Sequence, residues 1–538
     1  MLKKNTIKTI VLLCCLMMIF TGCKQNNAII RYDVNRGTKN LDPQFATDET
    51  AQLIIYNTFE GLLRSLPSGE IVPAAAESYN ISTDETVYTF TLRSGMRWKN
   101  GDPVTAADFE FAFKRMFNPI TKSPFVQQYS VIKNADKVIA GELTADSLAV
   151  KAEDERTLTI ELEKPNAFFT QILTHSSAMP CNKKSFDKSG GRYGLRLDTI
   201  DCNGPFYVKY WDNQSYIGLR KNSKYFDEHS VTTNGVNIYI NRKNSANPKG
   251  TVFDMLMQDD ADSARATYEQ MKIAVEKGYT ADKSVDTVWC LIFNQAESSE
   301  FKVLELRQAF SQAIDRVELE KQLKNGLSTA TRIMPPAVTL LGTGYNETVK
   351  VPLYYDYSPQ LAQTAYKQGL AILDVPRINN IRFLVSDVGS TPEIAVYLQQ
   401  MWQKDLGAYV NMSVLPQEEI DSKTKEGAYD IALVAFRPDM SRSGDRDILD
   451  RFVSTSSSNI TGYNNTDYDI YVKAAQFSVQ NDEIINNYRK AEMLLSRDVP
   501  VFPLWYQTGY YINGKDVSGI VHYPEPQRTY FKYAIREK

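Results

Sequence analysis

Residues 87–119 read VYTFTLRSGMRWKNGDPVTAADFEFAFKRMFNP, and this stretch decides the fold because strand, turn and helix signals follow one another in it. Its first part alternates apolar and polar residues, with Tyr88, Phe90 and Leu92 separated by threonines. A period of two is typical of a strand that buries one face. We therefore predict a strand over residues 87–92.

A helix is predicted in the second part of the same stretch. After a turn at residues 100–103, Thr105 offers a side-chain oxygen to free backbone N–H groups, and Asp108 stands three positions later, which is the pattern of a capping box. The Asn-Pro pair at residues 118–119 ends the run. The expected buried face of this helix consists of Phe109, Ala112, Phe113, Met116 and Phe117.

The same stretch resembles the extracytoplasmic solute-binding proteins of family 5, the oligopeptide- and dipeptide-binding components of ABC importers, through YTFTLR and GMRWKNGDPVTAADF. Further blocks match in order, so the resemblance covers essentially the whole chain after residue 30. These blocks are NLDP at 40–43, FEGL at 59–62, PAAAES at 73–78, NGPFYV at 203–208, RQAF at 307–310, TGYNN at 461–465, AEMLL at 491–495 and DVPVFPL at 498–504.

The resemblance implies an α/β fold of the two-lobed, periplasmic-binding-protein-like type (class II), with mixed sheets, a hinge and an extra third domain. Two chain crossings would join the lobes, and a ligand would be enclosed as they close. The expected division of the chain is a signal peptide at 1–22, a tether at 23–30, lobe I at 31–72, 190–286 and 498–538, the additional domain at 73–189, and lobe II at 287–497.

Periodicity in the second half agrees with an α/β lobe. We predict a strand from Val288 to Asn294, and a strand, helix and strand at residues 381–385, 392–406 and 410–414, with Gly407 ending the helix. Strand, helix and strand of these lengths predict a right-handed parallel crossover.

The N-terminus reads as an export signal. A basic segment with Lys3, Lys4 and Lys8 precedes eleven apolar residues, too few for a membrane-spanning helix, which needs about 20. The sequence Phe-Thr-Gly-Cys that ends at Cys23 resembles a bacterial lipobox, with Phe where Leu is usual, so Cys23 is the expected lipidation site. An ordinary secretory peptide with an incidental cysteine is the alternative.

Charge and composition argue against several classes of partner. The formal net charge of −3 becomes −6 when the three signal lysines are removed, and no basic stripe is present, so we expect no nucleic acid partner. The three histidines lie far apart in sequence, which gives no histidine-based metal site. After the signal and Cys23, three cysteines remain, as buried thiols or with a bridge between Cys181 and Cys202.

Catalytic motifs are absent from the sequence. We find no G-x-S-x-G elbow, no H-E-x-x-H, no Walker loop and no G-x-G-x-x-G after a strand. The sequence therefore favours a binding protein over an enzyme, with no cofactor.

Candidate ligand-binding residues follow from the resemblance. In this family an extended peptide pairs its backbone with cleft strands, and an aspartate binds the α-ammonium group of the peptide. The matching positions, with a nearby aromatic residue expected to line the cleft, are Arg36, Gly37, Thr38, Phe125, Phe436, Arg437 and Asp439.

The loop that begins at Asp439 departs from the family, because arginines and aspartates alternate in it; such mixed runs are usually solvated loop faces. Arg437 could instead meet a carboxylate of the ligand. Residues 439–450 also fit much of the EF-hand spacing, although a strand precedes them and serine is a weak ligand, so calcium is the minor alternative.

The sequence thus predicts a lipid-anchored, extracytoplasmic bacterial protein that captures oligopeptides and delivers them to the permease subunits of an ABC transporter, and that is a monomer. Alternatives with the same fold are binding of a nickel complex, haem, an opine or a sugar, and peptide sensing without transport. An exported hydrolase would need a nucleophile or metal site that we do not find.

Overall fold

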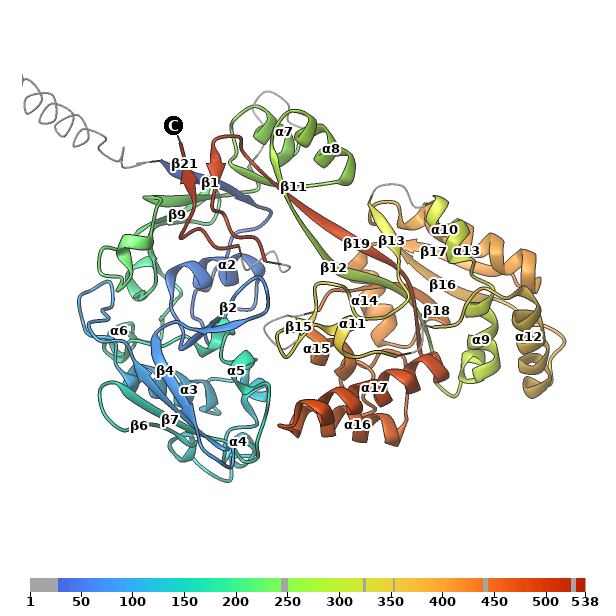
Figure 1. The fold of residues 1–538 in the computed structure, drawn as a ribbon, viewed down its shortest axis with the longest axis horizontal. Helices are drawn as coiled ribbons and strands as arrows, with labels where there is room; N and C mark the ends of the chain where they lie inside the picture. Colours follow the sequence, from blue (N-terminus) through green and yellow to red (C-terminus); the bar gives the residue numbers. More distant parts are fainter. Residues whose placement is uncertain are drawn as a thin grey trace, which may run out of the picture.

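The computed structural model describes residues 28–242, 250–322, 326–351, 354–438, 444–523 and 529–537. Figure 1 shows two lobes side by side, the first built mainly from the N-terminal half (blue to green) and the second from the C-terminal half (yellow to red). Strands from both halves pass between the lobes at the top of the view. The two-lobed α/β architecture inferred from the sequence is confirmed.

Lobe I contains a mixed four-stranded sheet in the order β1-β10-β9-β8, with β1 parallel to β10 and the other pairs antiparallel. Helix α2 (Glu49–Thr58) packs near this sheet, and the hairpin β2 (Leu63–Ser65) and β3 (Ile71–Pro73) follows it. The strands are β1 (Ile29–Val34), β8 (Phe206–Asp212), β9 (Tyr216–Lys221) and β10 (Gly235–Ile240).

The 87–119 stretch lies in a second sheet, with the order β4-β5-β7-β6, all pairs antiparallel. Its strands are β4 (Ala76–Ile81), β5 (Val87–Leu92), β6 (Val150–Ala152) and β7 (Thr157–Glu161). Tyr88, Phe90 and Leu92 are buried along β5, as predicted. This sheet shares one hydrophobic core with the lobe I sheet, so the two form one packed body.

Helix α3 (Ala106–Phe117) confirms the predicted capping box, since the Thr105 N–H donates to Asp108 Oδ2 at 2.9 Å. All five residues of its predicted apolar face are buried. Shorter helices complete the body: α4 (Ala135–Ile139), α5 (Phe169–Ile172) and α6 (Lys183–Lys188).

Lobe II is organised around a seven-stranded sheet in the order β11-β19-β12-β18-β16-β17, with β13 paired to β19. β16 is parallel to β17, which confirms the predicted crossover through α13. The strands are β11 (Ser263–Ala266), β12 (Thr280–Phe293), β13 (Leu327–Thr329), β16 (Ile381–Ser386), β17 (Val410–Leu415), β18 (Ile431–Phe436) and β19 (Val501–Asn513).

Helices cover both faces of this sheet (Figure 1) and give lobe II its own core. α13 ends at Gly407, whose φ of +66° is the left-handed cap predicted there. The helices are α9 (Leu304–Gln312), α10 (Arg316–Gln322), α12 (Pro359–Leu373), α13 (Thr391–Leu406), α14 (Gln417–Lys425), α15 (Gly444–Asp450), α16 (Thr466–Phe477) and α17 (Asn481–Asp498).

The remaining elements are short. α7 (Val252–Met257) and α8 (Tyr268–Glu276) pack on β11 and the upper part of β19 as a small separate core. Between β13 and α12 lie β14 (Thr339–Leu340), β15 (Thr343–Gly344) and α11 (Tyr345–Thr348), and the chain closes with β20 (Val517–Ser518) and β21 (Ile535–Arg536). Among the described residues, no helix has both the length and the apolar character needed to cross a bilayer.

Candidate functional site

The long strands β12 and β19 connect the two lobes. Their lower ends, up to Val288 in β12 and Tyr506 in β19, belong to the core of lobe II. Their upper ends pack against α7 and α8 through Ala281, Tyr510 and Ile512. Between these ends only Val285 packs against a core, that of lobe II. β12 and β19 are therefore the two crossings that the sequence implied, and β12 begins eight residues earlier than the strand predicted from Val288.

Arg437 lies directly after β18, beside β12. Val288 is the register partner of Phe436, so the next pair along the ladder places Arg437 opposite Thr287. The Arg437 Nε–H donates to Thr287 Oγ1 at 3.1 Å, and its side chain is 36% exposed. The guanidinium is thus held at the crossing with part of its surface open to solvent.

The side chain of Phe436 has a different environment from that of Arg437. Its ring is buried and contacts the ring of Phe452 edge to face, with centroids 5.9 Å apart. The side chain is therefore part of the lobe II core, and contact with a ligand at this position would have to come from the backbone.

Residues 36–38 follow β1 as a bend in lobe I and are not part of a regular strand. Arg36 is exposed, and its carbonyl oxygen accepts the hydroxyl of Thr50 at 2.7 Å. Thr38 is buried, and its hydroxyl donates to Asp48 Oδ2 at 2.8 Å. These bonds hold the backbone of the segment in place.

The backbone at Gly37 packs closely against Asn213, so a larger residue at position 37 would disturb the contact. A Cβ atom there would lie 3.0 Å from the carbonyl oxygen of Asn213, in the turn between β8 and β9. Trp211 donates its indole N–H to the Thr38 carbonyl at 3.1 Å. The backbone of residues 37–38 is thus packed against the end of the lobe I sheet.

Phe125 lies in lobe I, and its partly buried ring is 5.0 Å from that of His175. His175 Nδ1 accepts the backbone N–H of Ser177 at 3.1 Å and lies 2.7 Å from the Ser177 hydroxyl oxygen. The histidine has a structural role here, and Phe125 is a side chain packed on the lobe I core.

The structure therefore divides the candidate residues between the two lobes. Arg36, Gly37, Thr38 and Phe125 belong to lobe I, and Phe436 and Arg437 belong to lobe II. Among the residues that the structure describes, no hydrogen bond or ion pair joins the two sets. Cys23, Asp439 and the start of the 439–450 loop lie outside the described residues.

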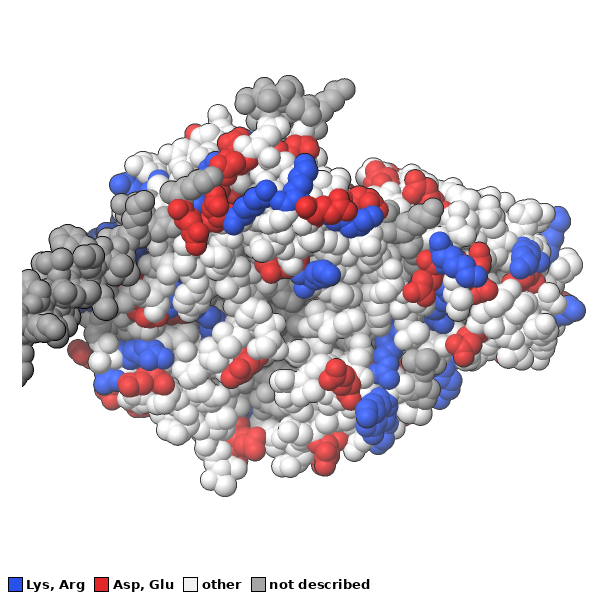
Figure 2. Space-filling view, turned by 45° about the horizontal axis from the view of Figure 1, so that its top comes forward, with Lys and Arg blue, Asp and Glu red and all other residues white. Residues whose placement is uncertain are grey.

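Contacts between the lobes occur away from these candidate residues. The ring of Phe168, from lobe I, is 6.3 Å from that of Tyr488 in α17. The turn between β2 and β3 reaches Thr339, because a Cβ atom on Gly69 would lie only 2.3 Å from its Oγ1. Figure 2 shows acidic and basic residues interspersed over one face of the molecule, which is hollowed between the lobes.

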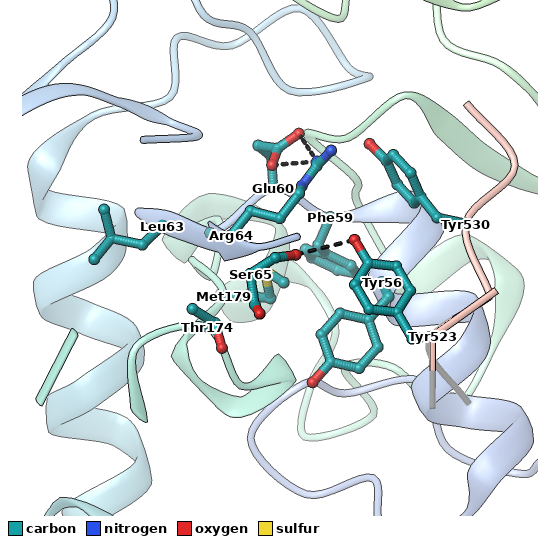
Figure 3. A pocket seen from close by; sticks show the side chains of 11 residues that line it. Tyr56, Phe59, Glu60, Leu63, Arg64, Ser65, Thr174, Met179, Tyr523 and Tyr530 are labelled. Atoms are coloured by element: carbon teal, nitrogen blue, oxygen red, sulfur yellow. Dashed lines mark hydrogen bonds and ion pairs between the residues drawn. The ribbon is translucent and has the colours of Figure 1, made fainter. Parts of the chain in front are cut away.

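A small pocket in lobe I is lined by aromatic residues and by the ion pair of Arg64 and Glu60 (Figure 3). Arg64 Nη2 donates to Glu60 Oε2 at 2.6 Å, and the guanidinium lies 4.3 Å from the ring centroid of Tyr530. The Tyr523 hydroxyl donates to the carbonyl of Ser65 at 3.0 Å. The cavity volume of about 30 Å³ is room for water molecules rather than for a peptide residue.

Sequence reasoning missed Asp286, a buried carboxylate on β12. Burial raises the pKa of this carboxyl, while the charge of Arg437 and the Thr287 hydroxyl lower it. Arg437 Nε is 3.8 Å from Asp286 Oδ1. A lone aspartate in a polar half-strand carries no sequence signal, so only the fold reveals it.

Metal and disulfide sites are not formed by the described residues. No group of three or more His, Cys, Asp or Glu side chains is placed to hold a metal ion there. Cys181, Cys202 and Cys290 are buried free thiols, which decides between the two alternatives left open by the sequence. Burial raises the pKa of Cys181 and of Cys202 to about 12, so both are unreactive thiols at neutral pH.

Comparison with known proteins identifies the chain. Residues 70–459 match the family described as bacterial extracellular solute-binding proteins, family 5 middle. The chain belongs to this family. Family 5 proteins bind solutes and are not enzymes, so this family 5 protein is a binding protein.

Relatives and solved structures match along nearly the whole chain. The oligopeptide-binding protein OppA of Bacillus subtilis (strain 168) is 26% identical, with 95% of this chain and 94% of that protein covered. The substrate-binding domain of an oligopeptide ABC transporter from Bacillus anthracis str. Ames has a TM-score of 0.74 at 28% identity, covering 96% and 100% of the two chains. Listeria monocytogenes OppA bound to peptide has a TM-score of 0.74 at 25% identity, covering 95% and 99%.

Proposed function

We propose that this family 5 protein captures oligopeptides between its two lobes and delivers them to an ABC importer. The observation that carries the proposal is the similarity, along nearly the whole chain, to proteins named for binding oligopeptides, one of them solved with a peptide. The two lobes, joined by β12 and β19, provide the surfaces that would close on an extended ligand.

The ligand would lie between backbone from both lobes. In this proposal residues 36–38 of lobe I and the backbone of Phe436 and Arg437 in lobe II pair with the peptide main chain, as an added β-strand would. This mode uses groups that every peptide carries, which suits a protein that accepts many sequences. Asp439 is proposed to bind the α-ammonium group, and Phe125 to line the cleft.

Membrane attachment is proposed to occur through a lipid on Cys23, with the signal peptide at 1–22 removed. In the same proposal lobe I comprises residues 31–72, 190–286 and 498–538, the additional domain 73–189, and lobe II 287–497. The protein would thus present its cleft outside the cell, next to the permease subunits of the importer.

Peptide capture is tested by mass spectrometry of compounds that co-purify with the protein from residue 26 onward, followed by calorimetry on the emptied protein with alanine peptides of two to eight residues. We expect mixed short peptides in the first experiment and a preferred length in the second. N-acetylated peptides should bind more weakly than free ones in wild type, but equally in Asp439→Asn. A single non-peptide compound would keep the fold and overturn the substrate.

The anchor is tested separately, by growing cells that express the full chain with an alkyne-labelled fatty acid. Wild type should take up the label and fractionate with membranes, and Cys23→Ser should do neither. Label on Cys23→Ser would contradict the assignment of this cysteine.

A further inference from the structure

The crossing between the lobes contains an irregularity centred on Asp286. β12 pairs with β19 in regular antiparallel register up to Val285 and again from Thr287, and the register shifts between them. Asp286 is therefore the extra residue of a β-bulge, and bulges redirect side chains. The bulge turns a carboxylate into the crossing, where it is 5% exposed.

Two arginines from different elements lie near this carboxylate. Arg437, after β18, has its Nε 3.8 Å from Asp286 Oδ1. Arg265, on β11, lies on the other side: a Cβ atom on Gly509 would be 3.8 Å from Asp286 Oδ2 and 4.0 Å from Arg265 Nη2. Both groups therefore lie beside Gly509 of β19, where a methyl group would meet them at ordinary van der Waals distance.

The charges in this cluster do not balance. Asp286 Oδ1 already accepts the Thr287 hydroxyl at 2.8 Å. The Arg265 side chain makes no ion pair or hydrogen bond with any described residue. The terminal nitrogens of Arg437 likewise have no hydrogen-bond partner among them. Within this cluster of described side chains, two guanidinium groups thus stand against the one carboxylate of Asp286.

Tyr511, on β19, adds an unused donor to the cluster. Its ring is 3% exposed, and its hydroxyl has no hydrogen-bond partner in the described part of the chain. Tyr511 is the register partner of Arg265, and its hydroxyl lies within range of the charges of Arg265, Asp286 and Arg437. The guanidinium of Arg265 lies 5.7 Å from the Tyr511 ring centroid. A buried hydroxyl without a partner, beside excess positive charge, indicates a place for an anionic acceptor.

We propose that Arg265, Arg437 and Tyr511 form an anion subsite at the crossing, which binds a carboxylate carried by the ligand. The subsite rests on the proposed function and adds a side-chain preference to it: peptides with an acidic residue near the crossing bind more tightly than matched neutral ones. The planar guanidinium forks suit a carboxylate, because each can donate two parallel N–H bonds. Arg265 is exposed, so the subsite opens to solvent.

The position of the subsite also links the preference for acidic peptides to closure of the two lobes. Arg265 lies on β11, the edge strand of the seven-stranded sheet, which packs on α7 and α8, whereas Arg437 follows β18 in the part of the same sheet that belongs to the lobe II core. A carboxylate that bonds to both would hold these two parts of the sheet in one relative orientation. A ligand changes a conformational equilibrium only through such differential contacts.

The preference is measured by calorimetry with pentaalanine peptides in which Glu, Gln or Lys replaces each position in turn. At one position we expect Glu to bind about tenfold more tightly than Gln in low salt, because one charge-assisted bond has about this value. Arg437→Gln, Arg265→Gln and Tyr511→Phe should each bring the Glu-to-Gln affinity ratio toward one. The control Arg196→Gln, an exposed arginine paired with Asp198 in lobe I, should keep the wild-type ratio.

Succinate tests the same subsite without a peptide. It should raise the Tm of wild type and of Arg196→Gln more than it raises that of Arg437→Gln and Arg265→Gln. If no pentapeptide binds but succinate discriminates between the variants, the proposed function fails and the subsite stands. If the Glu and Gln peptides bind equally at every position, or if the ratio survives Arg437→Gln and Arg265→Gln together, the subsite is wrong.

Discussion

Arg115 and Asp42 form a buried bidentate ion pair, with Nη1 2.6 Å from Oδ2 and Nη2 2.7 Å from Oδ1. Arg115 lies on α3, beside the second sheet, and Asp42 lies in the turn that follows β1. The two side chains are 5% and 7% exposed. The guanidinium is also surrounded by the rings of three aromatic residues, Phe45, Phe186 and Tyr193. One ion pair thus joins the additional sheet to the rest of lobe I.

Asp42→Ala is expected to lower the free energy of unfolding by about 3–5 kcal/mol, because it leaves a buried guanidinium without its counter-charge. Arg115→Lys should cost less, since it keeps the charge but loses the second hydrogen bond. Urea denaturation at pH 7 measures both. Arg196→Ala, which breaks an exposed pair, serves as the control and should change little. Equal losses in Asp42→Ala and Arg196→Ala would contradict this assignment.

Asp108, in the capping box of α3, accepts hydrogen bonds from two donors. Its Oδ2 accepts the Thr105 N–H at 2.9 Å and the Trp98 indole N–H at 3.2 Å. Asp108→Ala removes the acceptor of both bonds and leaves the indole N–H of the fully buried Trp98 without a partner, so we expect a loss of about 1–3 kcal/mol. The comparison is Asp136→Ala, an exposed aspartate in the first turn of α4, and thermal unfolding should separate the two variants clearly.

Gly204 belongs to the Asn-Gly-Pro-Phe block that the sequence marked as a tight turn. Its N–H donates to the carbonyl of Thr58 at 2.9 Å, and a Cβ atom would lie 2.7 Å from the backbone nitrogen of Phe59. Because backbone cannot move aside easily, Gly204→Ala should destabilise the fold by about 1–3 kcal/mol.

Gly344→Ala is the matched control for this substitution. Its nearest neighbour would be Glu347 Cδ at 3.4 Å, an atom near the end of a flexible side chain. A Gly204→Ala protein with the same denaturation midpoint as Gly344→Ala would show that α2 can shift to accept the methyl group.

The 87–119 stretch was predictable because each signal in it is local. β5, the capping box and the buried face of α3 depend on residues a few positions apart, and the structure confirms all three. β12 was predicted only in its lower part. Its first six residues are exposed or half-buried, since they lie outside the lobe II core and have no apolar alternation.

The candidate site was less accessible to sequence reasoning. Family resemblance located Phe436 and Arg437, but the burial of the Phe436 ring depends on Phe452, which the sequence does not place beside it. Asp286, Arg265 and Tyr511 come from three distant segments and meet only because β11, β19 and β12 are neighbours in one sheet. The bulge that turns Asp286 inward has no signature in the sequence.

His522 is partly buried, and the loss of solvent around its ring lowers its pKa to about 3. Its ring stacks on Tyr511 with centroids 4.2 Å apart and an interplanar angle of 8°. Because the folded state keeps this imidazole neutral while the unfolded chain protonates near pH 6.5, stability is lost as the pH falls below 6.5. We expect a loss of about 2 kcal/mol between pH 7 and pH 5 from this residue alone.

Urea denaturation at pH 7, 6 and 5 tests this expectation with two variants. His522→Gln should flatten the acid dependence of the free energy of unfolding, whatever its stability at pH 7. His229→Gln should keep the wild-type slope, because the His229 side chain is fully exposed. NMR titration of the wild type is an independent check, since only three histidines contribute imidazole signals. The His522 imidazole should remain neutral down to pH 4, and its protonation near pH 6.5 would contradict the lowered pKa.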